Sequence, residues 1–312
     1  MTHTTQRVEI TEVGMRDGFQ MEQAIIPTRT KVEIGRALIA AGLSRIEATS
    51  FVSPRAVPQL SDATEVIEEL KGHGARLAAL VPNLRGAERA AAAGADEMVV
   101  FVSASETHNR LNINSSVIDS LAKVGEIAML ARSAGTELCG AVATSFGCPF
   151  EGDISPDAVT RVVESYASAG VHHVTLGDTT GMATPPLVDR LCRVLLKRFP
   201  EVTFSLHFHN TRGLGLVNVR AGLEAGVNHY ESSIGGLGGC PFATGATGNI
   251  CTEDLVYMMD ETGITTGIDL EAISDVAHRL EAVLGRTLPG QLMKAGPRLK
   301  LHQVDETRIA TG

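Results

Sequence analysis

One helix–strand unit of the sequence reads SPDAVTRVVESYASAGVHHVTLGD, from Ser155 to Asp178. Its first part predicts an amphipathic helix, because Ser155 suits the N-cap, Pro156 is tolerated in the first turn and Gly170 can end the helix. Its second part, from His172 to Asp178, is an apolar run with strand character and a polar tip. We therefore interpret this stretch as one repeat of an α/β fold.

The same arrangement recurs along the whole chain. Alternating strands and helices predict parallel strands joined by crossover helices. Eight fairly even units, without a dinucleotide-binding fingerprint after the first strand, favour a closed TIM (β/α)₈ barrel over an open doubly wound sheet. The predicted strands are Val8–Val13, Arg45–Val52, Arg76–Val81, Glu97–Ser103, Leu138–Ser145, His172–Asp178, Thr203–His209 and His229–Ile234.

The remaining C-terminal residues add to this barrel. We expect residues 1–312 to form one barrel domain, with residues from about 268 to 312 as a C-terminal extension of one or two helices and a polar tail. The extension either covers an end of the barrel or mediates assembly.

Composition excludes several classes of protein. The formal net charge of −9 argues against a nucleic-acid partner, which requires a surplus of Lys and Arg. No apolar run approaches the roughly 20 residues of a membrane span, and the N-terminus has no secretory signal pattern. Five cysteines at irregular spacing do not suggest a disulfide framework. We therefore expect a cytoplasmic protein that binds neither nucleic acid nor membrane.

Polar side chains gather where the predicted strands end, which in such barrels is the position of the active site. A buried carboxylate within the second strand, Glu47, needs a partner such as Arg16 after the first strand. His172 and His173, in contrast, are interpreted as surface or packing residues. The polar residues at strand ends include Arg16, Asp17, Glu47, Thr144, Asp178, His207 and His209.

His207 and His209 suggest a metal site, because strand residues two apart share a face about 6–7 Å from one another. Such a pair also occurs on ordinary strands, but Asp17 at another strand end strengthens the case. Two imidazoles with a carboxylate and the amide oxygen of Asn249 suit Mg²⁺ or Mn²⁺ better than structural zinc, although the ligands leave zinc open.

Cys240 differs from the other cysteines, because glycines surround it in a loop after the eighth strand. The other four are most simply small buried hydrophobic residues. A thiol of ordinary pKa about 8.5 can transfer a proton near neutrality beside a cation. The glycine-rich loop could alternatively hold a phosphate, although it lacks the lysine of a P-loop.

Several motifs together resemble the barrel metallolyases typified by 3-hydroxy-3-methylglutaryl-coenzyme A lyase. The resemblance spans roughly Val8 to Gly267. The glycine-rich Cys240 motif is the most specific and argues against the related condensing synthases and aldolases. The matching motifs are Gly14–Gln20 (GMRDGFQ), Ile46–Pro54 (IEATSFVSP), Leu176–Thr179 (LGDT), Gly236–Ala243 (GLGGCPFA), Gly245–Asn249 (GATGN) and Thr252–Val256 (TEDLV).

The resemblance implies an enzyme that cleaves 3-hydroxy-3-methylglutaryl-CoA to acetyl-CoA and acetoacetate with a divalent metal, Mg or Mn. It also implies an acyl-CoA substrate, a homo-oligomer such as a dimer, and a place in leucine breakdown. It implies roles by position: metal ligands Asp17, His207, His209 and Asn249; substrate-binding Arg16 and Gln20; acid/base Cys240, with catalytic support from Arg16, Glu47, Asp178 and Glu253.

The chain departs from the family pattern at a few positions. Asn210 replaces the Asp that usually follows the second histidine, Met15 replaces a Pro, and the segment 105–110 matches only in part. Asn210 is expected to point away from the histidine pair. A lyase for a related substrate such as citramalyl-CoA remains an alternative, as does a metal-binding barrel without catalytic activity.

Overall fold

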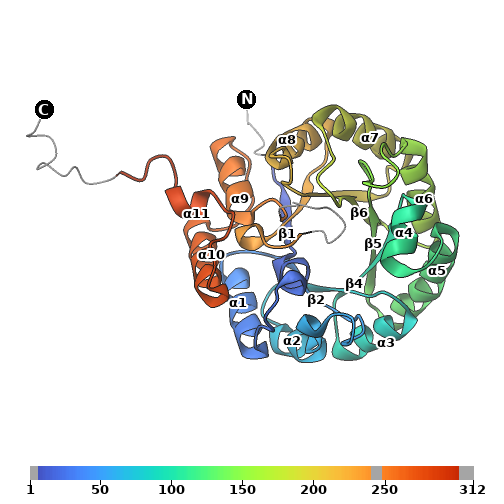
Figure 1. Cartoon of the computed structure of the whole chain (residues 1–312), viewed down its shortest axis with the longest axis horizontal. Coiled ribbons are helices and arrows are strands. Elements are labelled where there is room, and N and C mark those ends of the chain that lie inside the picture. The colour runs from blue at the N-terminus through green and yellow to red at the C-terminus, as the bar shows by residue number, and fades with distance from the viewer. Residues whose placement is uncertain (1–5, 240–247, 302–312) are drawn as a thin grey trace, which may run out of the picture.

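In the computed structural model, which describes residues 6–239 and 248–301, eight parallel strands close into a barrel in the order β1 to β8. This confirms the predicted (β/α)₈ barrel, and Figure 1 shows the helices arranged as a ring around it. The strands are β1 (Glu9–Glu12), β2 (Arg45–Ser50), β3 (Arg76–Leu80), β4 (Glu97–Ser103), β5 (Glu137–Ala143), β6 (His173–Asp178), β7 (Thr203–Phe208) and β8 (His229–Ser232).

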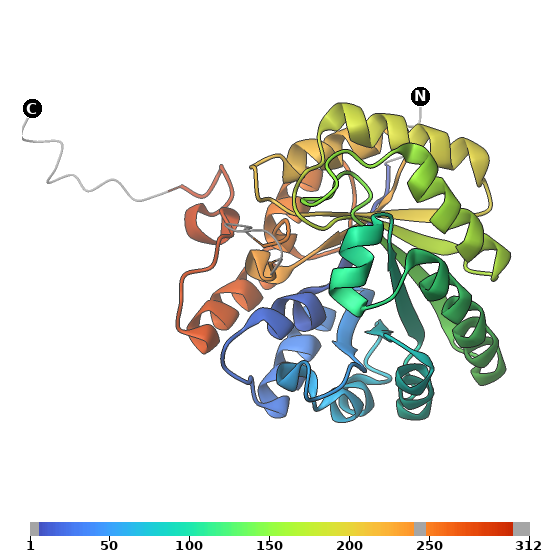
Figure 2. The ribbon, with the colours of Figure 1, turned by 45° about the vertical axis from the view of Figure 1, so that its right-hand side comes forward.

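The helices follow the strands and pack their apolar faces on the outside of the barrel. The helices are α1 (Thr28–Ala40), α2 (Ala63–Leu70), α3 (Leu84–Ala93), α4 (Glu106–Ile113), α5 (Val117–Ala134), α6 (Pro156–Ser168), α7 (Pro185–Arg198), α8 (Gly215–Ala225), α9 (Thr252–Glu261), α10 (Leu270–Leu284) and α11 (Leu292–Ala295). Figure 2 shows α4 in front of the barrel, at the end where β4 leads into it. None of the helices in residues 6–239 and 248–301 combines the length and apolar character of a membrane span.

The first strand is shorter than predicted. It ends at Glu12, because the chain then turns into one π-helical turn, η1 (Gly14–Gly18), which the backbone N–H of Phe19 closes by donating to the carbonyl of Gly14. Such wide turns are uncommon and occur often at functional sites. Here the turn carries Arg16 and Asp17 at the end of the barrel where the strands finish.

The opposite end of the barrel interior is filled by a polar network. Arg45 donates to Glu97 at 2.8 Å, and one of its guanidinium nitrogens lies 3.0 Å from Nδ1 of His173. His173 Nε2 lies 2.6 Å from the hydroxyl of Ser205. His173 is therefore a packing residue of the barrel interior, and its ring takes part in this network.

Two further helices, α10 and α11, follow residue 268. α10 packs against both α1 and α9, and α11 lies next to α9 and α10. Figure 1 shows these helices outside the barrel on the β1 side. They therefore lie beside the barrel wall where the first and last strands meet.

Candidate functional site

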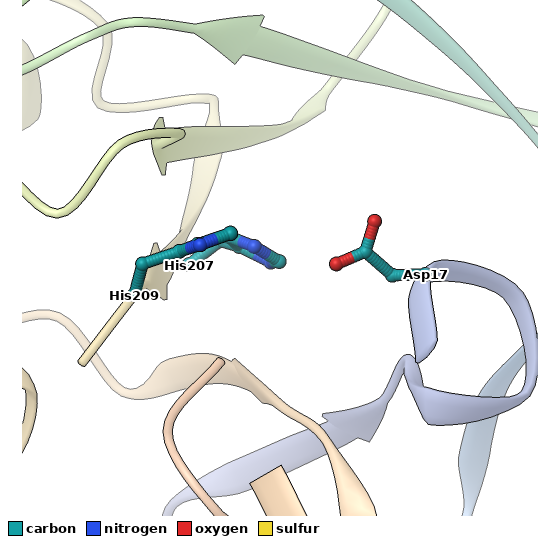
Figure 3. Close-up of side chains that lie close together, drawn as sticks. All are labelled: Asp17, His207 and His209. Carbon is teal, nitrogen blue, oxygen red and sulfur yellow. The ribbon is translucent and has the colours of Figure 1, made fainter. Parts of the chain in front are cut away.

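Three side chains from distant parts of the sequence converge at the C-terminal end of the barrel. Asp17 comes from η1, His207 from β7, and His209 directly follows that strand. One ligand atom from each lies within 4.8 Å of the others, and the two imidazole rings are 5.2 Å apart between centroids. Figure 3 shows both rings pointing towards the Asp17 carboxylate. This spacing suits a single metal ion between them.

Asn249 is attached to the same cluster. It pairs with His209 in an isolated β-bridge, and its side-chain NH₂ donates to Asp17 Oδ2 at 2.7 Å and to the carbonyl of Leu237 at 3.0 Å. These two bonds fix the orientation of the amide. Its buried Oδ1 has no hydrogen-bond partner among the described residues. An unsatisfied amide oxygen beside a carboxylate and two imidazoles fits the donor set of a divalent cation.

A glycine allows the loop after β8 to lie against this cluster. Gly238 has φ +106°, and a Cβ there would lie 2.6 Å from Asn249 Nδ2 and 3.0 Å from Asp17 Oδ2. Any side chain would be strained in this conformation and would displace the Asn249–Asp17 hydrogen bond. The close approach of the backbone to Asn249 and Asp17 therefore requires glycine at position 238.

Arg16 joins two carboxylates. Its guanidinium lies 2.6 Å from Asp17 Oδ1 and 2.6 Å from Glu47 Oε2. Burial by itself would lower the pKa of Arg16, but Glu47 and then Asp17 raise it above its ordinary value, so the guanidinium stays charged. The sequence-based expectation that Glu47 requires a partner such as Arg16 is confirmed.

The pKa values of two carboxyl groups in this cluster are shifted in opposite directions. Burial would raise the pKa of Asp17, yet Arg16, His207 and His209 together lower it, so Asp17 is ionised. Burial raises the pKa of Glu47 despite the attraction of Arg16. Gln20 completes the group, since its amide donates to Asp17 Oδ1 at 3.2 Å. An ionised carboxylate facing two imidazoles provides the negative charge that a cation requires.

The cluster faces a cavity of about 670 Å³ at the mouth of the barrel. One part of it is lined by the polar residues Arg16, Asp17, Gln20, Glu47, His207 and His209. Apolar residues of β3 to β5 and the end of α4 line another part, including Leu80, Val99, Phe101 and Ile113. A ligand with a polar reacting end and a longer body fits a cavity of this kind.

Glu231 on β8 was not predicted as a site residue. Its Oε2 lies 2.9 Å from His207 Nδ1, and its Oε1 accepts a hydrogen bond from Thr175 at 2.6 Å. Burial would raise the pKa of Glu231, but its bonds with His207 and Thr175 and the charge of Arg45 lower it to about 2. The available signal was an acidic residue in the middle of an apolar strand, the same signal that singled out Glu47.

Asp178 lies at the end of β6, but its side chain is directed to the backbone of its own loop. Its Oδ1 accepts from the N–H groups of Met182 at 2.7 Å and Ala183 at 2.9 Å. Burial raises its pKa to about 6. These hydrogen bonds hold the backbone of the loop after β6. Among the residues that the structure describes, Asp178 is not one of those that line the cavity.

Glu253 and Glu12 lie behind the cluster and hold backbone in place. Glu12 Oε1 accepts from the N–H groups of Gly14 at 2.7 Å and Ile234 at 2.8 Å. Glu253 Oε2 accepts from the N–H of Gly235 at 3.0 Å. Glu12 thereby links η1 to the loop after β8. The sequence did not identify Glu12, although it is another acidic residue in an apolar strand.

The buried position of Glu253 predicts a pH-dependent stability. Burial raises its pKa from 4.5 to about 8. Its contribution to stability is therefore complete below the unfolded value of 4.5 and is lost as pH rises through about 8. Glu253→Gln should remove this loss, which amounts to about 3–5 kcal/mol. Urea unfolding at pH 5, 7 and 9 measures the difference.

The matched control for this prediction is Glu224→Gln on α8, where the carboxylate is exposed and paired with Arg220 at 2.8 Å. We expect Glu224→Gln to follow the wild-type pH profile, whereas Glu253→Gln should gain stability relative to wild type progressively as the pH rises from about 4.5 to about 8. Parallel profiles for wild type and Glu253→Gln would show that this carboxyl group titrates normally.

The remaining predicted positions are accounted for as follows. Cys240 lies outside the described residues, and the other four cysteines are buried and free.

Asn210 is exposed and its side chain accepts from the N–H of Gly215 at 3.1 Å, so it points away from the histidines as expected. Arg212 donates to the carbonyls of Thr180 at 3.1 Å and Gly181 at 2.8 Å, which joins two loops at the barrel mouth. Met15 is fully buried in the core.

Comparison with known proteins agrees with this arrangement. The HMGL-like family model matches residues 7–280 of the chain. The chain is 42% identical over 303 residues to (R)-citramalyl-CoA lyase of Chloroflexus aurantiacus, covering 94% of this chain and 96% of that protein. It is 41% identical over 295 residues to the mitochondrial hydroxymethylglutaryl-CoA lyase of Homo sapiens, covering 94% and 91%.

A solved structure is similar over almost its whole length. It is an HMG-CoA lyase from Acinetobacter baumannii in complex with coenzyme A and 3-methylmalate, 46% identical in sequence, with a TM-score of 0.93. The match covers 97% of this chain and 100% of that one.

Proposed function

This chain belongs to the HMGL-like family, and on that premise we propose that it is a metal-dependent carbon–carbon lyase that cleaves 3-hydroxy-3-methylglutaryl-CoA to acetyl-CoA and acetoacetate. The observation that carries the proposal is the convergence of Asp17, His207 and His209 in a cavity that Arg16 also lines. The unsatisfied Oδ1 of Asn249 supports a fourth ligand at the same place.

The reaction breaks the bond between C2 and C3 of the acyl chain. The C3 hydroxyl loses its proton, its oxygen becomes the ketone of acetoacetate, and the electrons of the broken bond form the enolate of the acetyl thioester. That enolate must then receive a proton at carbon to give acetyl-CoA. Asp17, His207, His209 and Asn249 would hold a divalent metal, which would lower the pKa of the C3 hydroxyl.

Arg16 supplies the positive charge that this reaction needs. Its pKa is raised by Glu47 and Asp17 against the effect of burial, so it remains a cation throughout the working pH range. A fixed cation in a partly enclosed cavity offsets the negative charge that develops on the thioester oxygen. Gln20 and Glu47 hold the Arg16–Asp17 pair in position through their contacts.

We assign protonation of the enolate carbon to Cys240, on the basis of its motif. Gly239, the residue before it in the sequence, lines the cavity. The thiol of a cysteine can serve as a general acid when its pKa is close to the working pH. Asp178 and Glu253 act in this scheme by holding the loops after β6 and β8.

The donor set favours Mg²⁺ or Mn²⁺ as the ion. One carboxylate, one amide oxygen and two imidazoles leave room in an octahedral shell for substrate oxygens. We also propose that the chain forms a homodimer, works in the cytoplasm and takes part in leucine breakdown. Size-exclusion chromatography with light scattering tests the dimer directly.

Cleavage of citramalyl-CoA to acetyl-CoA and pyruvate is the second candidate. The identity of 42% to the (R)-citramalyl-CoA lyase of Chloroflexus aurantiacus supports it. Both reactions break the same kind of bond and would use the same residues. The two substrates differ only in the group attached to the carbon that becomes the ketone. The residues that line the cavity around this group therefore determine which substrate binds.

A cleavage assay on metal-stripped protein tests the proposal. Each acyl-CoA is offered with and without Mg²⁺ or Mn²⁺, and acetoacetate and pyruvate are measured. Metal-dependent acetoacetate from 3-hydroxy-3-methylglutaryl-CoA is the expected result. Pyruvate from citramalyl-CoA alone would favour the second candidate, and no cleavage of either substrate would contradict the lyase assignment.

A further inference from the structure

We infer that Glu231 is a positioning residue of the metal centre, which holds His207 in the one tautomer and ring orientation that can bind the metal. The inference rests on the proposed function, because it assumes that His207 is a metal ligand. It concerns a residue that does not itself belong to the proposed ligand set.

The contact between the two side chains determines where the proton of His207 lies. His207 and Glu231 are opposite one another in the register of β7 and β8, and Nδ1 lies 2.9 Å from Glu231 Oε2. An ionised carboxylate can only accept hydrogen bonds, so Nδ1 must carry the proton. The lone pair of the neutral ring is then on Nε2, which leaves that nitrogen to bind a cation.

A second residue prevents the carboxylate from rotating away. Thr175 on β6 donates its hydroxyl to Glu231 Oε1 at 2.6 Å. Each oxygen of Glu231 therefore has its own partner, one from β6 and one from β7. Three side chains on three successive strands form a chain of hydrogen bonds that ends at the proposed ligand.

A purely structural role explains this arrangement less well. Glu231 and Thr175 both line the cavity, and the Glu231 side chain keeps 15% of its exposure. Packing at this place needs no charge, and a carboxylate that is largely removed from water carries a cost. A positioning role does require the charge, because an ionised carboxylate can only accept a hydrogen bond and so keeps the proton of His207 on Nδ1.

Glu231→Gln is the central test, because it keeps the shape of the side chain. A carboxamide can donate to Nδ1 as well as accept from it, so the tautomer of His207 is no longer fixed. We expect the affinity for Mn²⁺, measured by calorimetry on metal-stripped protein, to fall about 10- to 100-fold. Glu224→Gln, the same change at an exposed ion pair on α8, should leave that affinity unchanged.

The threonine provides a second pair of variants. Thr175→Val removes the hydroxyl at nearly constant volume and should weaken Mn²⁺ binding by several-fold. Thr175→Ser restores the hydroxyl and should bring the affinity back towards wild type. If Glu231→Gln does not fold, as judged by circular dichroism, this pair decides the question.

Nitrogen NMR of ¹⁵N-histidine-labelled, metal-free protein observes the tautomer directly. The signal of His207 is assigned as the one that disappears in the His207→Gln variant. In the wild type, this signal should show the proton on Nδ1. In Glu231→Gln that signal should shift towards a mixture of tautomers. Wild-type Mn²⁺ affinity together with an unchanged His207 signal in Glu231→Gln would overturn the inference, while the metal site itself would stand. Failure of the wild type to bind Mn²⁺ would instead overturn the metal centre, and with it the role given to Glu231.

Discussion

Asp17→Asn is expected to abolish measurable cleavage and to weaken Mn²⁺ binding by more than about 100-fold. This loss of affinity is larger than the one usually seen when a residue that only orients a metal ligand is substituted. The substitution keeps the size of the side chain and removes the carboxylate charge that faces His207 and His209. In the wild type, both carboxylate oxygens of Asp17 accept hydrogen bonds: Oδ1 from Arg16 and Gln20, and Oδ2 from Asn249. The substitution replaces one of these acceptors with an NH₂ group, which can only donate. Wherever the new NH₂ lies, it meets a donor.

Calorimetry with Mn²⁺ and the cleavage assay at saturating metal measure these two effects separately. The matched control is Asp189→Asn on α7, an exposed carboxylate that pairs with Arg193 at 2.7 Å and lies outside the cavity. It should retain both metal affinity and turnover. Wild-type Mn²⁺ affinity in Asp17→Asn would mean that the metal is held elsewhere.

The fold could be predicted from the sequence because its signals are local and repeated. A helix–strand unit such as Ser155–Asp178 has its own cap, its own stop and its own apolar run. One difference lies at the start of the chain, where the predicted strand Val8–Val13 ends at Glu12. The π-helical turn that follows depends on Glu12 accepting bonds from Gly14 and from Ile234, more than 200 residues away. No local pattern contains that contact.

The site was predictable where strand periodicity alone places side chains together. His207 and His209 share a face because they are two residues apart, and Glu47 required a cation because it lies in an apolar strand. Glu231 satisfies the same criterion but was not selected. Its partner His207 becomes visible only once β8 closes the barrel beside β7 with these residues opposite one another. The register of a closed barrel is a property of all its strands, and a single strand does not reveal it.

Arg16→Met is expected to lower kcat by about 10²- to 10³-fold, as removal of a charge-stabilising group from an active site does. The guanidinium lies 2.6 Å from both Asp17 and Glu47, and its side chain is only 13% exposed. Removing it also leaves Glu47 without its ion-pair partner in a buried position, which costs stability as well as rate. The lower thermal midpoint and the lower kcat of Arg16→Met therefore need to be separated.

The double variant Arg16→Met/Glu47→Gln separates the two effects, because it removes the unpaired charge along with the cation. We expect the thermal midpoint to recover towards wild type, while kcat stays about as low as in Arg16→Met. Arg16→Lys should recover part of the rate, since an ammonium keeps the charge but cannot make both contacts at once. If the double variant recovers kcat together with stability, Arg16 serves to neutralise Glu47, and another group must offset the charge of the enolate.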